Sequence, residues 1–422
     1  MTEDSVKKPG RLAPALAFHT PIVARKAEGV YVEAEDGRRY IDLTAGLAST
    51  NAGHCPPEVV DAARAQIERL IHSGCIFHYG VEEELVGKLA EITPGQINTF
   101  FFSNSGAEAV EGAIKLARYH TGRQAIISFT GGFHGRTFGA LSLTTSSARY
   151  RDRYHPLLPS VFTTPYPYCY RCPMGQRRDT CSLECFSYLE RVLKHQVSAS
   201  EVACAVIEPV LGEGGYVVPP AAFLQRLREL CTREGILLVA DEVQAGFGRT
   251  GRWFACEHFG VVPDIMTMAK GIASGFPLSA VGSTEEIMSK WAPGAHGTTF
   301  GGNPVSCAAS IATIDKIRND GLLENAVRVG SYATGRLCRM QEKYPFIGDV
   351  RSLGLMIGVE MIKEDGSPDK GLLERIMKKC LDGGLIMIEC GADKNIARVM
   401  PALTITEAQM KESLDIFEEA LV

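Results

Sequence analysis

The sequence predicts an α/β protein in which a large domain, with a mostly parallel sheet flanked by helices, is joined to a smaller α+β domain. Short apolar runs alternate with helical patterns, and such runs are typical of strands buried on both faces of a parallel sheet. Beyond about Ser306 the pattern changes to long helices and a few short strands. At 422 residues the chain has room for two domains. We expect an N-terminal segment over residues 1–57 that packs with the small domain, a large domain over 58–306 and a small domain over 307–422.

Composition and charge argue against several classes of protein. Apolar residues make up 45% of the chain and charged residues 22%, which is ordinary for a globular protein. The formal net charge of −5 gives no sign of the excess of basic residues that is typical of nucleic-acid-binding proteins. No apolar run reaches the roughly 18 residues that cross a bilayer. Because residues 1–8 hold no apolar core, we expect no signal peptide and a cytoplasmic location.

The first third of the chain contains a hairpin, a loop and a helix. Gly29–Asp42 is predicted to form the hairpin, turned at Asp36 and the glycine after it. The small residues of Thr44–His54 predict a loop outside the core. An amphipathic helix is expected from Pro57 onward. Its buried face should consist of Val60, Ala63 and Ile67.

Several apolar runs are predicted to be strands of the parallel sheet. They are Thr99–Phe102, Ala125–Phe129, Ala205–Ile207, Ile236–Ala240 and Ile265–Ala269. The fourth run ends at Asp241 and the fifth ends at Lys270. In open α/β sheets the chemistry lies just beyond the carboxyl ends of the strands, so both side chains are well placed to act.

Asp241 and Lys270 together indicate a pyridoxal phosphate site. A lysine in partly desolvated surroundings has a lowered pKa and can form a Schiff base. An aspartate can keep the pyridine nitrogen protonated, so that the ring accepts electrons. Either residue alone would more simply be a capping acid or a surface lysine. The pair, with glycines between its members, favours the cofactor.

Gly246–Gly251 matches the G-x-G-x-x-G pattern of dinucleotide-binding proteins, but its context does not. That motif requires a strand that runs straight into the first glycine and a helix that opens on the third. Here Asp241–Gln244 lies in between, and Arg252–Phe254 does not begin a convincing helix. We interpret the segment as a turn.

Other strand ends offer groups for a phosphate and for a substrate. Ser105–Glu108 joins a strand to a helix, and the free N–H groups of such a turn suit a phosphate. An ordinary capping box is the alternative. Phe133 could stack on a flat ring, and Arg136 could bind a carboxylate. Glu213 lies among glycines and is expected to reach into a cleft. Arg398, in an apolar strand, needs an anionic partner.

These residues together resemble the class III (ω-type) pyridoxal phosphate-dependent aminotransferases of fold type I, over nearly the whole chain. The resemblance rests on Ser105–Glu108, Phe133–Thr137, Glu208–Gly215, Asp241–Gln244, Phe247–Gly251, Lys270–Gly271 and His296–Pro304.

The resemblance implies a role for each residue of the cofactor site. Lys270 is the Schiff-base lysine and proton shuttle, and Asp241 pairs with the pyridinium nitrogen. Gln244 bonds the ring hydroxyl, and Phe133 stacks on the ring. The phosphate is held by Gly106 and Ala107 and, from the neighbouring subunit, by Thr299, which implies a homodimer, with a tetramer as the alternative. The cofactor site is also expected to include Ser105, His134, Glu208 and Val243.

Within the family the pattern most resembles 4-aminobutyrate aminotransferases, which implies an ω-amino acid donor and 2-oxoglutarate. Arg136 then binds the distal carboxylate and Arg398 the α-carboxylate of glutamate, while Glu213 pairs with Arg398 when the donor lacks that carboxylate. Leu47 is expected to contact the substrate. Acetylornithine and ornithine aminotransferases are near alternatives, and an amino-acid racemase or a decarboxylase of the same fold keeps Lys270 with its aspartate.

Two features depart from the family pattern. Ala107 stands where many relatives carry a hydroxyl, so one phosphate hydrogen bond is expected to be missing. The segment with Cys169, Cys172, Cys181 and Cys185 approaches zinc-ligand spacing. A zinc-binding protein built on an inactive scaffold is the rival from another class, against which the intact Lys270 argues. We expect no metal and interpret the segment as a structural loop, with local disulfides as another alternative.

Overall fold

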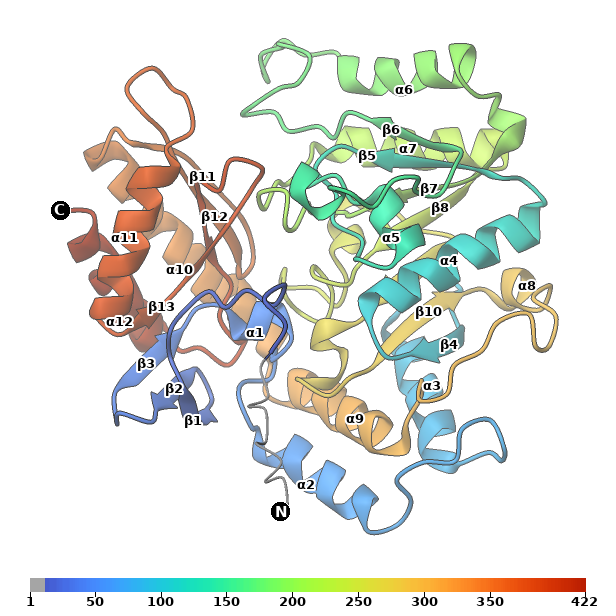
Figure 1. Cartoon of the computed structure of the whole chain (residues 1–422), viewed down its shortest axis with the longest axis horizontal. Coiled ribbons are helices and arrows are strands. Elements are labelled where there is room, and N and C mark those ends of the chain that lie inside the picture. Colours follow the sequence, from blue (N-terminus) through green and yellow to red (C-terminus); the bar gives the residue numbers. More distant parts are fainter. Residues whose placement is uncertain (1–11) are drawn as a thin grey trace, which may run out of the picture.

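A seven-stranded sheet forms the centre of the larger part of the molecule in the computed structural model, which describes residues 12–422 (Figure 1). Its strands are β4 (Thr99–Ser103), β5 (Ala125–Phe129), β6 (Val161–Thr164), β7 (Val202–Ile207), β8 (Leu237–Asp241), β9 (Ile265–Met268) and β10 (Ser279–Ser283). They lie in the order β4-β10-β9-β8-β7-β5-β6. Only β10 runs against its neighbours. The predicted, mostly parallel sheet is therefore confirmed.

Helices cover both faces of this sheet. The main ones are α4 (Gly106–Thr121), α5 (Phe138–Leu143), α6 (Glu184–His195) and α7 (Ala221–Glu234). Along β7, Val206 packs in the core that α4 contributes to, whereas Ala205 and Ile207 pack with α6 and α7. Adjacent strand residues thus enter different cores, which is why these strands are apolar at every position.

Helix α2 (Pro57–Ile67) begins where the sequence predicts but buries a different face. Val59 and Ala63 are buried, while Val60 is half-buried and Ile67 is 51% exposed. The expected face was wrong because α2 packs on α9 (Pro304–Asn319) with the side that carries Val59 and Ala63. Helix α9 also packs on α3 (Gly80–Ile92), and the short α8 (Glu285–Met288) packs on α4.

The smaller part of the molecule combines two four-stranded sheets with three helices (Figure 1). One sheet has the order β11 (Ile347–Leu353), β12 (Met356–Met361), β15 (Ile396–Val399) and β14 (Ile388–Cys390), and it is antiparallel throughout. The other has the order β1 (Ala24–Glu28), β2 (Tyr31–Ala34), β3 (Arg39–Asp42) and β13 (Leu385–Ile386). The helices are α10 (Leu322–Lys343), α11 (Lys370–Asp382) and α12 (Glu407–Ala420).

Strands β2 and β3 form the predicted hairpin, with Gly37 at a φ of +83° in its turn. Strand β3 pairs in parallel with β13, so the N-terminal strands extend a sheet that also contains a strand from the end of the chain. The division at residues 57 and 306 stays a prediction. The first eleven residues of the 1–57 segment, and with them the expectation about a signal peptide, lie outside the described residues.

The segment Thr44–His54 is largely buried, contrary to the expectation of a loop outside the core. It includes the short helical turn α1 (Ala45–Ala48), and Asn51 is only 1% exposed. The Asn51 amide donates to the Phe247 carbonyl at 2.8 Å and accepts from the buried Arg249 at 2.6 Å. The prediction failed because small residues can pack closely against a distant loop, and their own sequence does not reveal it.

The cysteines are free thiols, and most of those outside the loop before α6 are buried. In that loop, Cys169, Cys172 and Cys181 are half-buried, and the Cys181 thiol donates to Glu184 at 3.0 Å. Across residues 12–422, no three His, Cys, Asp or Glu side chains are grouped so as to hold a metal ion. The structural role of this loop stays a prediction. Over the same residues, no helix is both long and apolar enough to span a membrane.

Candidate active site

Asp241 and Lys270 lie at the carboxyl ends of adjacent parallel strands. Asp241 ends β8 and is in register with Thr267 of β9, and Lys270 follows β9 by two residues. Lys270 has a φ of +47°, a left-handed conformation that is costly for a residue with a side chain. The chain leaves the sheet abruptly at this point, at the sheet edge where α/β proteins carry their sites.

The Asp241 carboxylate is buried but fully bonded. It is 3% exposed, and Oδ1 accepts from the Thr267 hydroxyl at 3.0 Å and from the Val243 N–H at 3.2 Å. Oδ2 lies 2.7 Å from Nδ1 of the buried His134. Burial disfavours the His134 imidazolium, but the bond to Asp241 and the charges of Asp241 and Glu208 outweigh it, so the pKa of His134 is raised. The His134 contact and the two donors to Oδ1 fix the orientation of the Asp241 carboxylate.

Glu208 is a second buried carboxyl of the site, and it organises two loops. Its oxygens accept from the Phe133 and Gly212 N–H groups, both at 3.0 Å. Burial, together with the charge of Asp241, raises the pKa of Glu208 to about 7. Glu208 therefore fixes the Phe133 loop and the turn before Glu213 relative to each other.

Burial lowers the pKa of Lys270 below its ordinary value. The charges of Glu208, Asp241 and Glu213 oppose this effect, while Arg398 adds to it. These four groups come from three segments of the chain, so predicted acid and substrate residues from distant stretches act on one amine. A lysine with a lowered pKa has a larger neutral fraction, which is the nucleophilic form.

The start of α4 has a side-chain helix cap, and the predicted phosphate site lies next to it. Ser105 is the N-cap, whose hydroxyl accepts from the Glu108 N–H at 3.3 Å. The first N–H groups of a helix lack partners within it, and those of Gly106 and Ala107 lie on half-exposed residues. A side chain at Gly106 would meet Val243 Cγ1 at 2.8 Å, so glycine permits this close approach. The cap and the predicted phosphate site are compatible.

The residues present fit pyridoxal phosphate. Gln244 is 9% exposed, and its buried Oε1 has no hydrogen-bond partner among the described residues, as expected for a group that awaits a ligand. A carbonyl oxygen accepts hydrogen bonds, and the cofactor has a ring hydroxyl. The half-buried Phe133 lies beside the His134–Asp241 pair, and the α4 N-terminus can hold a phosphate.

Glu213 and Arg398 form an ion pair, as the resemblance implies. Arg398 is 3% exposed and donates to Glu213 Oε2. Its guanidinium also donates twice to the Glu389 carbonyl, at 2.7 and 3.0 Å. The other Glu213 oxygen accepts from the Tyr150 hydroxyl at 3.0 Å. The buried arginine is therefore paired with an acid of its own chain.

Three predicted residues stay at the surface of the single chain. Arg136 is exposed, with its Cζ 4.6 Å from the centre of the Tyr150 ring and 5.9 Å from that of Phe133. Leu47 is 46% exposed, and Thr299 is exposed in the segment that follows α8. Their predicted contacts with substrate and with the neighbouring subunit stay predictions.

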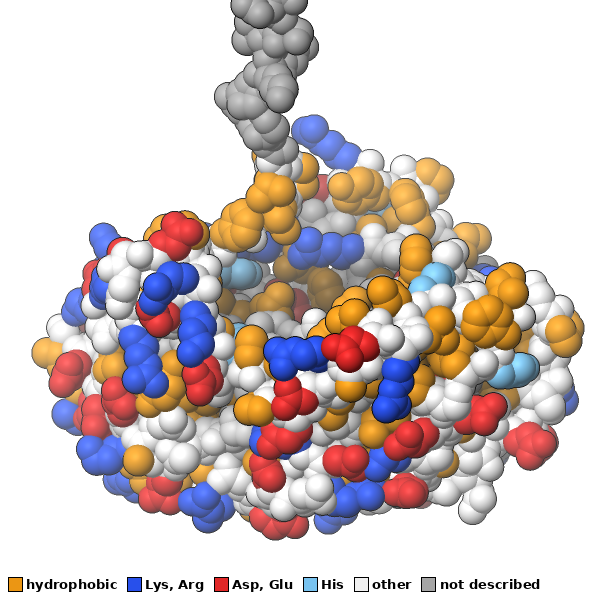
Figure 2. Space-filling view, turned by 90° about the horizontal axis from the view of Figure 1, so that it is seen from below, with side chains coloured by type: hydrophobic (Ala, Val, Ile, Leu, Met, Phe, Trp, Pro, Cys, Tyr) orange, Lys and Arg blue, Asp and Glu red, His pale blue; other side chains and the backbone are white. Residues whose placement is uncertain are grey.

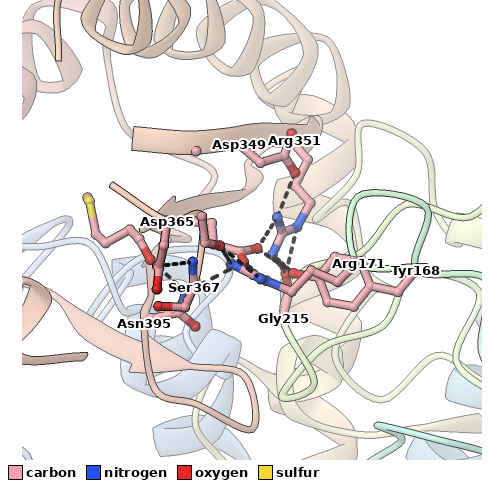
Figure 3. A network of polar contacts seen from close by, with 12 residues as sticks. Tyr168, Arg171, Gly215, Asp349, Arg351, Asp365, Ser367 and Asn395 are labelled. Atoms are coloured by element: carbon pink, nitrogen blue, oxygen red, sulfur yellow. Dashed lines mark hydrogen bonds and ion pairs between the residues drawn. The ribbon is translucent and has the colours of Figure 1, made fainter. Parts of the chain in front are cut away.

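A polar network around the buried Glu360 holds the backbone beyond Glu213 (Figure 3). Arg351 of β11 donates to the Gly215 carbonyl at 2.6 and 2.8 Å and to the Tyr168 hydroxyl at 2.7 Å. Arg351 also bonds Glu360 at 2.8 Å, and Glu360 accepts from Arg171. The network joins the antiparallel sheet to the turn that carries Glu213.

Two residues of the site were missed by sequence reasoning. Thr267 supports Asp241, and Tyr150 contacts both Glu213 and Arg136. Thr267 could have been found, because it is a polar residue inside the otherwise apolar strand that leads to Lys270. Tyr150 lies in a short 3-10 turn with no motif, so no local signal marks it.

Glu242, next to Asp241, should give the stability a pH dependence. Burial raises its pKa from 4.5 to about 7. Between these values the unfolded chain ionises before the folded one, so the free energy of unfolding should fall by roughly 3 kcal/mol as the pH rises and level off above 7. Glu242→Gln cannot ionise and should gain stability relative to the parent at pH 8 but not at pH 4. Urea denaturation at both pH values tests this, and an equal difference at both would contradict it.

Comparison with known proteins identifies the family. Residues 14–421 match the family described as aminotransferase class-III. The 4-aminobutyrate aminotransferase of Mycobacterium tuberculosis (strain ATCC 25618 / H37Rv) is 42% identical over 404 residues, covering 94% of this chain and 90% of that protein. The leucine/methionine racemase of Thermococcus litoralis is 40% identical over 424 residues, 99% of this chain and 95% of that protein. The solved (S)-enantioselective omega-transaminase from Thermomicrobium roseum superposes with a TM-score of 0.88 at 35% identity, covering 96% of this chain and 92% of that one. The chain therefore belongs to the class-III aminotransferases, which are pyridoxal phosphate-dependent transferases of fold type I.

Proposed function

We propose that the protein transfers the amino group of an ω-amino acid, such as 4-aminobutyrate, to 2-oxoglutarate, yielding a semialdehyde and glutamate. The observation that carries this proposal is the Glu213–Arg398 pair beside Lys270. An arginine that an acid of the same chain neutralises can serve donors without a carboxylate near the reacting amine. Once released, it can bind the α-carboxylate of glutamate. The relative named for 4-aminobutyrate supports the same donor class.

Lys270 and Asp241 carry the chemistry in this proposal. Pyridoxal phosphate, when bound, supplies an electron sink next to the donor nitrogen. Asp241, held in place by Thr267 and His134, would keep a proton on the pyridine nitrogen. Lys270 Nζ would hold the cofactor, and it would act as the base that takes a proton from the donor carbon and gives it back.

Substrate recognition divides between the two arginines. Arg136 is exposed beside Phe133, where its planar fork can take the distal carboxylate of either substrate. Arg398 is buried, so its charge needs a partner at every stage of the reaction. Glu213 supplies that partner for the ω-amine, and the α-carboxylate supplies it for glutamate.

A panel of amines offered with 2-oxoglutarate tests the proposal. Glutamate should form with 4-aminobutyrate and related ω-amino acids, and more slowly with ornithine or acetylornithine. Glutamate formation with the two ornithine donors alone would assign the chain to the alternative donor class. Because the Thermococcus litoralis relative is named a racemase, loss of optical activity of leucine without any glutamate would favour racemisation instead.

We further propose that the enzyme is a homodimer built on an apolar surface next to Thr299. Ile76 is 84% exposed, Phe77 is 56% exposed and Phe300 is 60% exposed. Their two segments lie together, because the Phe300 ring centre is 5.0 Å from that of His72. Figure 2 shows the molecule from below, with hydrophobic side chains gathered beside a hollow. Helix α2 and the loop after it lie at the bottom of Figure 1 and therefore belong to this face. Exposed apolar surface of this kind marks interfaces.

Ile76→Asp should weaken the dimer, because it places a charge in the apolar surface. We expect a monomer fraction in light scattering at micromolar concentration and a loss of activity that higher protein concentration restores. Val422→Asp, at an equally exposed position (86%) at the chain end, is the matched control. An Ile76→Asp variant with the parental mass and activity at all concentrations would contradict this surface as the interface.

A further inference from the structure

We propose that Tyr150 is a specificity-determining residue, whose hydroxyl holds Glu213 against Arg398 and so biases the pocket toward donors without an α-carboxylate. The hydroxyl donates to Glu213 Oε1 at 3.0 Å, while Oε2 accepts from Arg398. Both oxygens of Glu213 are thus engaged in the closed pair. This inference rests on the proposed function, because it concerns how the same Glu213–Arg398 pair opens.

The backbone is held before Glu213 by the Gly212 N–H bond to Glu208 and after it by two further contacts, so opening depends on its side chain alone. Its carbonyl accepts from the Gly391 N–H at 2.9 Å. The Gly215 carbonyl, two residues on, accepts twice from Arg351 (Figure 3). A Cβ at Gly214 would lie 2.3 Å from the Gly131 carbonyl oxygen, so this turn is tightly packed. The closed state is therefore a side-chain rotamer of Glu213, and Tyr150 stabilises that rotamer.

The Tyr150 ring has a separate role from its hydroxyl. The Arg136 guanidinium lies 4.6 Å from the ring centre, and the Phe133 ring meets it edge-on at 5.6 Å. A cation over an aromatic face is attracted by the ring, so Tyr150 also steadies the exposed Arg136. Tyr150→Phe keeps this ring and removes only the hydroxyl, which separates the two roles.

Ligand binding to the holoenzyme gives the direct test. A dicarboxylate such as glutarate must displace Glu213 from Arg398, whereas butyrate, with one carboxylate, need not. Tyr150→Phe removes the hydrogen bond that stabilises Glu213 in its closed position. Because a bond to a charged group contributes appreciable free energy, glutarate should displace Glu213 more easily and bind roughly tenfold more tightly. Butyrate binding should not change. Calorimetric titration with both acids measures this, and Tyr188→Phe, which removes the same hydroxyl from α6, is the matched control.

Half-reaction kinetics extend the test to catalysis. In Tyr150→Phe, the kcat/KM ratio of glutamate to 4-aminobutyrate should rise by about tenfold. The same substitution in a Glu213→Gln background should change the ratio much less, because the carboxylate that accepts the Tyr150 hydrogen bond has already been replaced by an amide. Thermal stability and the absorbance of the bound cofactor should match the parent, which separates this role from a structural one.

The outcomes separate the two proposals. If Glu213→Gln changes the donor ratio while Tyr150→Phe leaves both glutarate binding and the ratio at parental values, the inference about Tyr150 is wrong and the proposed function stands. An equal loss of both half-reactions in Tyr150→Phe would also overturn it. If the parent converts neither donor, or Glu213→Gln leaves the ratio unchanged, the proposed function fails, and the inference fails with it.

Discussion

Replacing Lys270 with alanine should abolish turnover, lowering kcat by about four powers of ten or more, because the variant loses the group that moves the proton. It should also lose the covalent attachment of the cofactor. Borohydride reduction of the holoenzyme followed by peptide mapping tests the second effect. In the parent, the modified peptide should contain Lys270, which lies two residues after the buried strand β9. In Lys270→Ala, no modified peptide should be found.

Lys88→Ala is the matched control, since Lys88 of α3 pairs with Asp315 of α9 at 2.5 Å and, within residues 12–422, forms no hydrogen bond or ion pair with a residue of the site. It should retain parental activity and the same modified peptide. A label on any lysine other than Lys270 would show that the residue at the end of β9 has been assigned the wrong role. An added primary amine should restore part of the activity of Lys270→Ala, because a diffusible base can take over the proton transfer.

Replacing Asp241 with asparagine should lower kcat by about three powers of ten, because the amide cannot hold a proton on the pyridine nitrogen. The shape of the side chain is preserved, and the bond from the Thr267 hydroxyl at 3.0 Å can remain. The variant should therefore fold and bind the cofactor with an altered absorbance spectrum. Stopped-flow measurement of the first half-reaction isolates the chemical step from product release.

Glu242→Gln is a closely matched control for this change. Glu242 is the next residue and is fully buried, and the substitution makes the same chemical change. Its Oε1 accepts from the Cys256 N–H at 2.7 Å, away from the Asp241–His134 pair. The control should retain parental turnover. If both variants lost turnover equally, the replacement of any buried carboxyl group near β8 would explain the loss, and the special role of Asp241 would be refuted.

For His134, the sequence predicted that the residue belongs to the site but not which group it contacts. The family resemblance places His134 in the cofactor site, but only the structure shows its Nδ1 2.7 Å from Asp241 Oδ2. The two residues are 107 positions apart, with His134 in the loop after β5 and Asp241 at the end of β8. Periodicity predicts which strands are buried, whereas the contact depends on how β5 and β8 are ordered in the sheet.

Glu213 gives a second example, in which the same sequence pattern allows two structures. Glycines on both sides of it would permit a mobile turn, yet Gly391 donates to the Glu213 carbonyl and Arg351 donates to the Gly215 carbonyl. Glycine here permits close packing as well as flexibility, since a Cβ at Gly214 would collide with the Gly131 carbonyl. A sequence cannot distinguish these two uses of glycine without the partner segment.

The sequence by itself determined the fold class, the strands that end at Asp241 and Lys270, and the turn at Gly246–Gly251. Each of these depends on hydrophobic pattern and turn chemistry within a short stretch of chain. Only the tertiary structure decided which face α2 buries, that the small residues of Thr44–His54 enter the core, and that Tyr150 joins Glu213 to Arg136. These features depend on contacts between segments that are far apart in the sequence. Such contacts stabilise the fold, but neither segment alone shows a periodic pattern that would predict them.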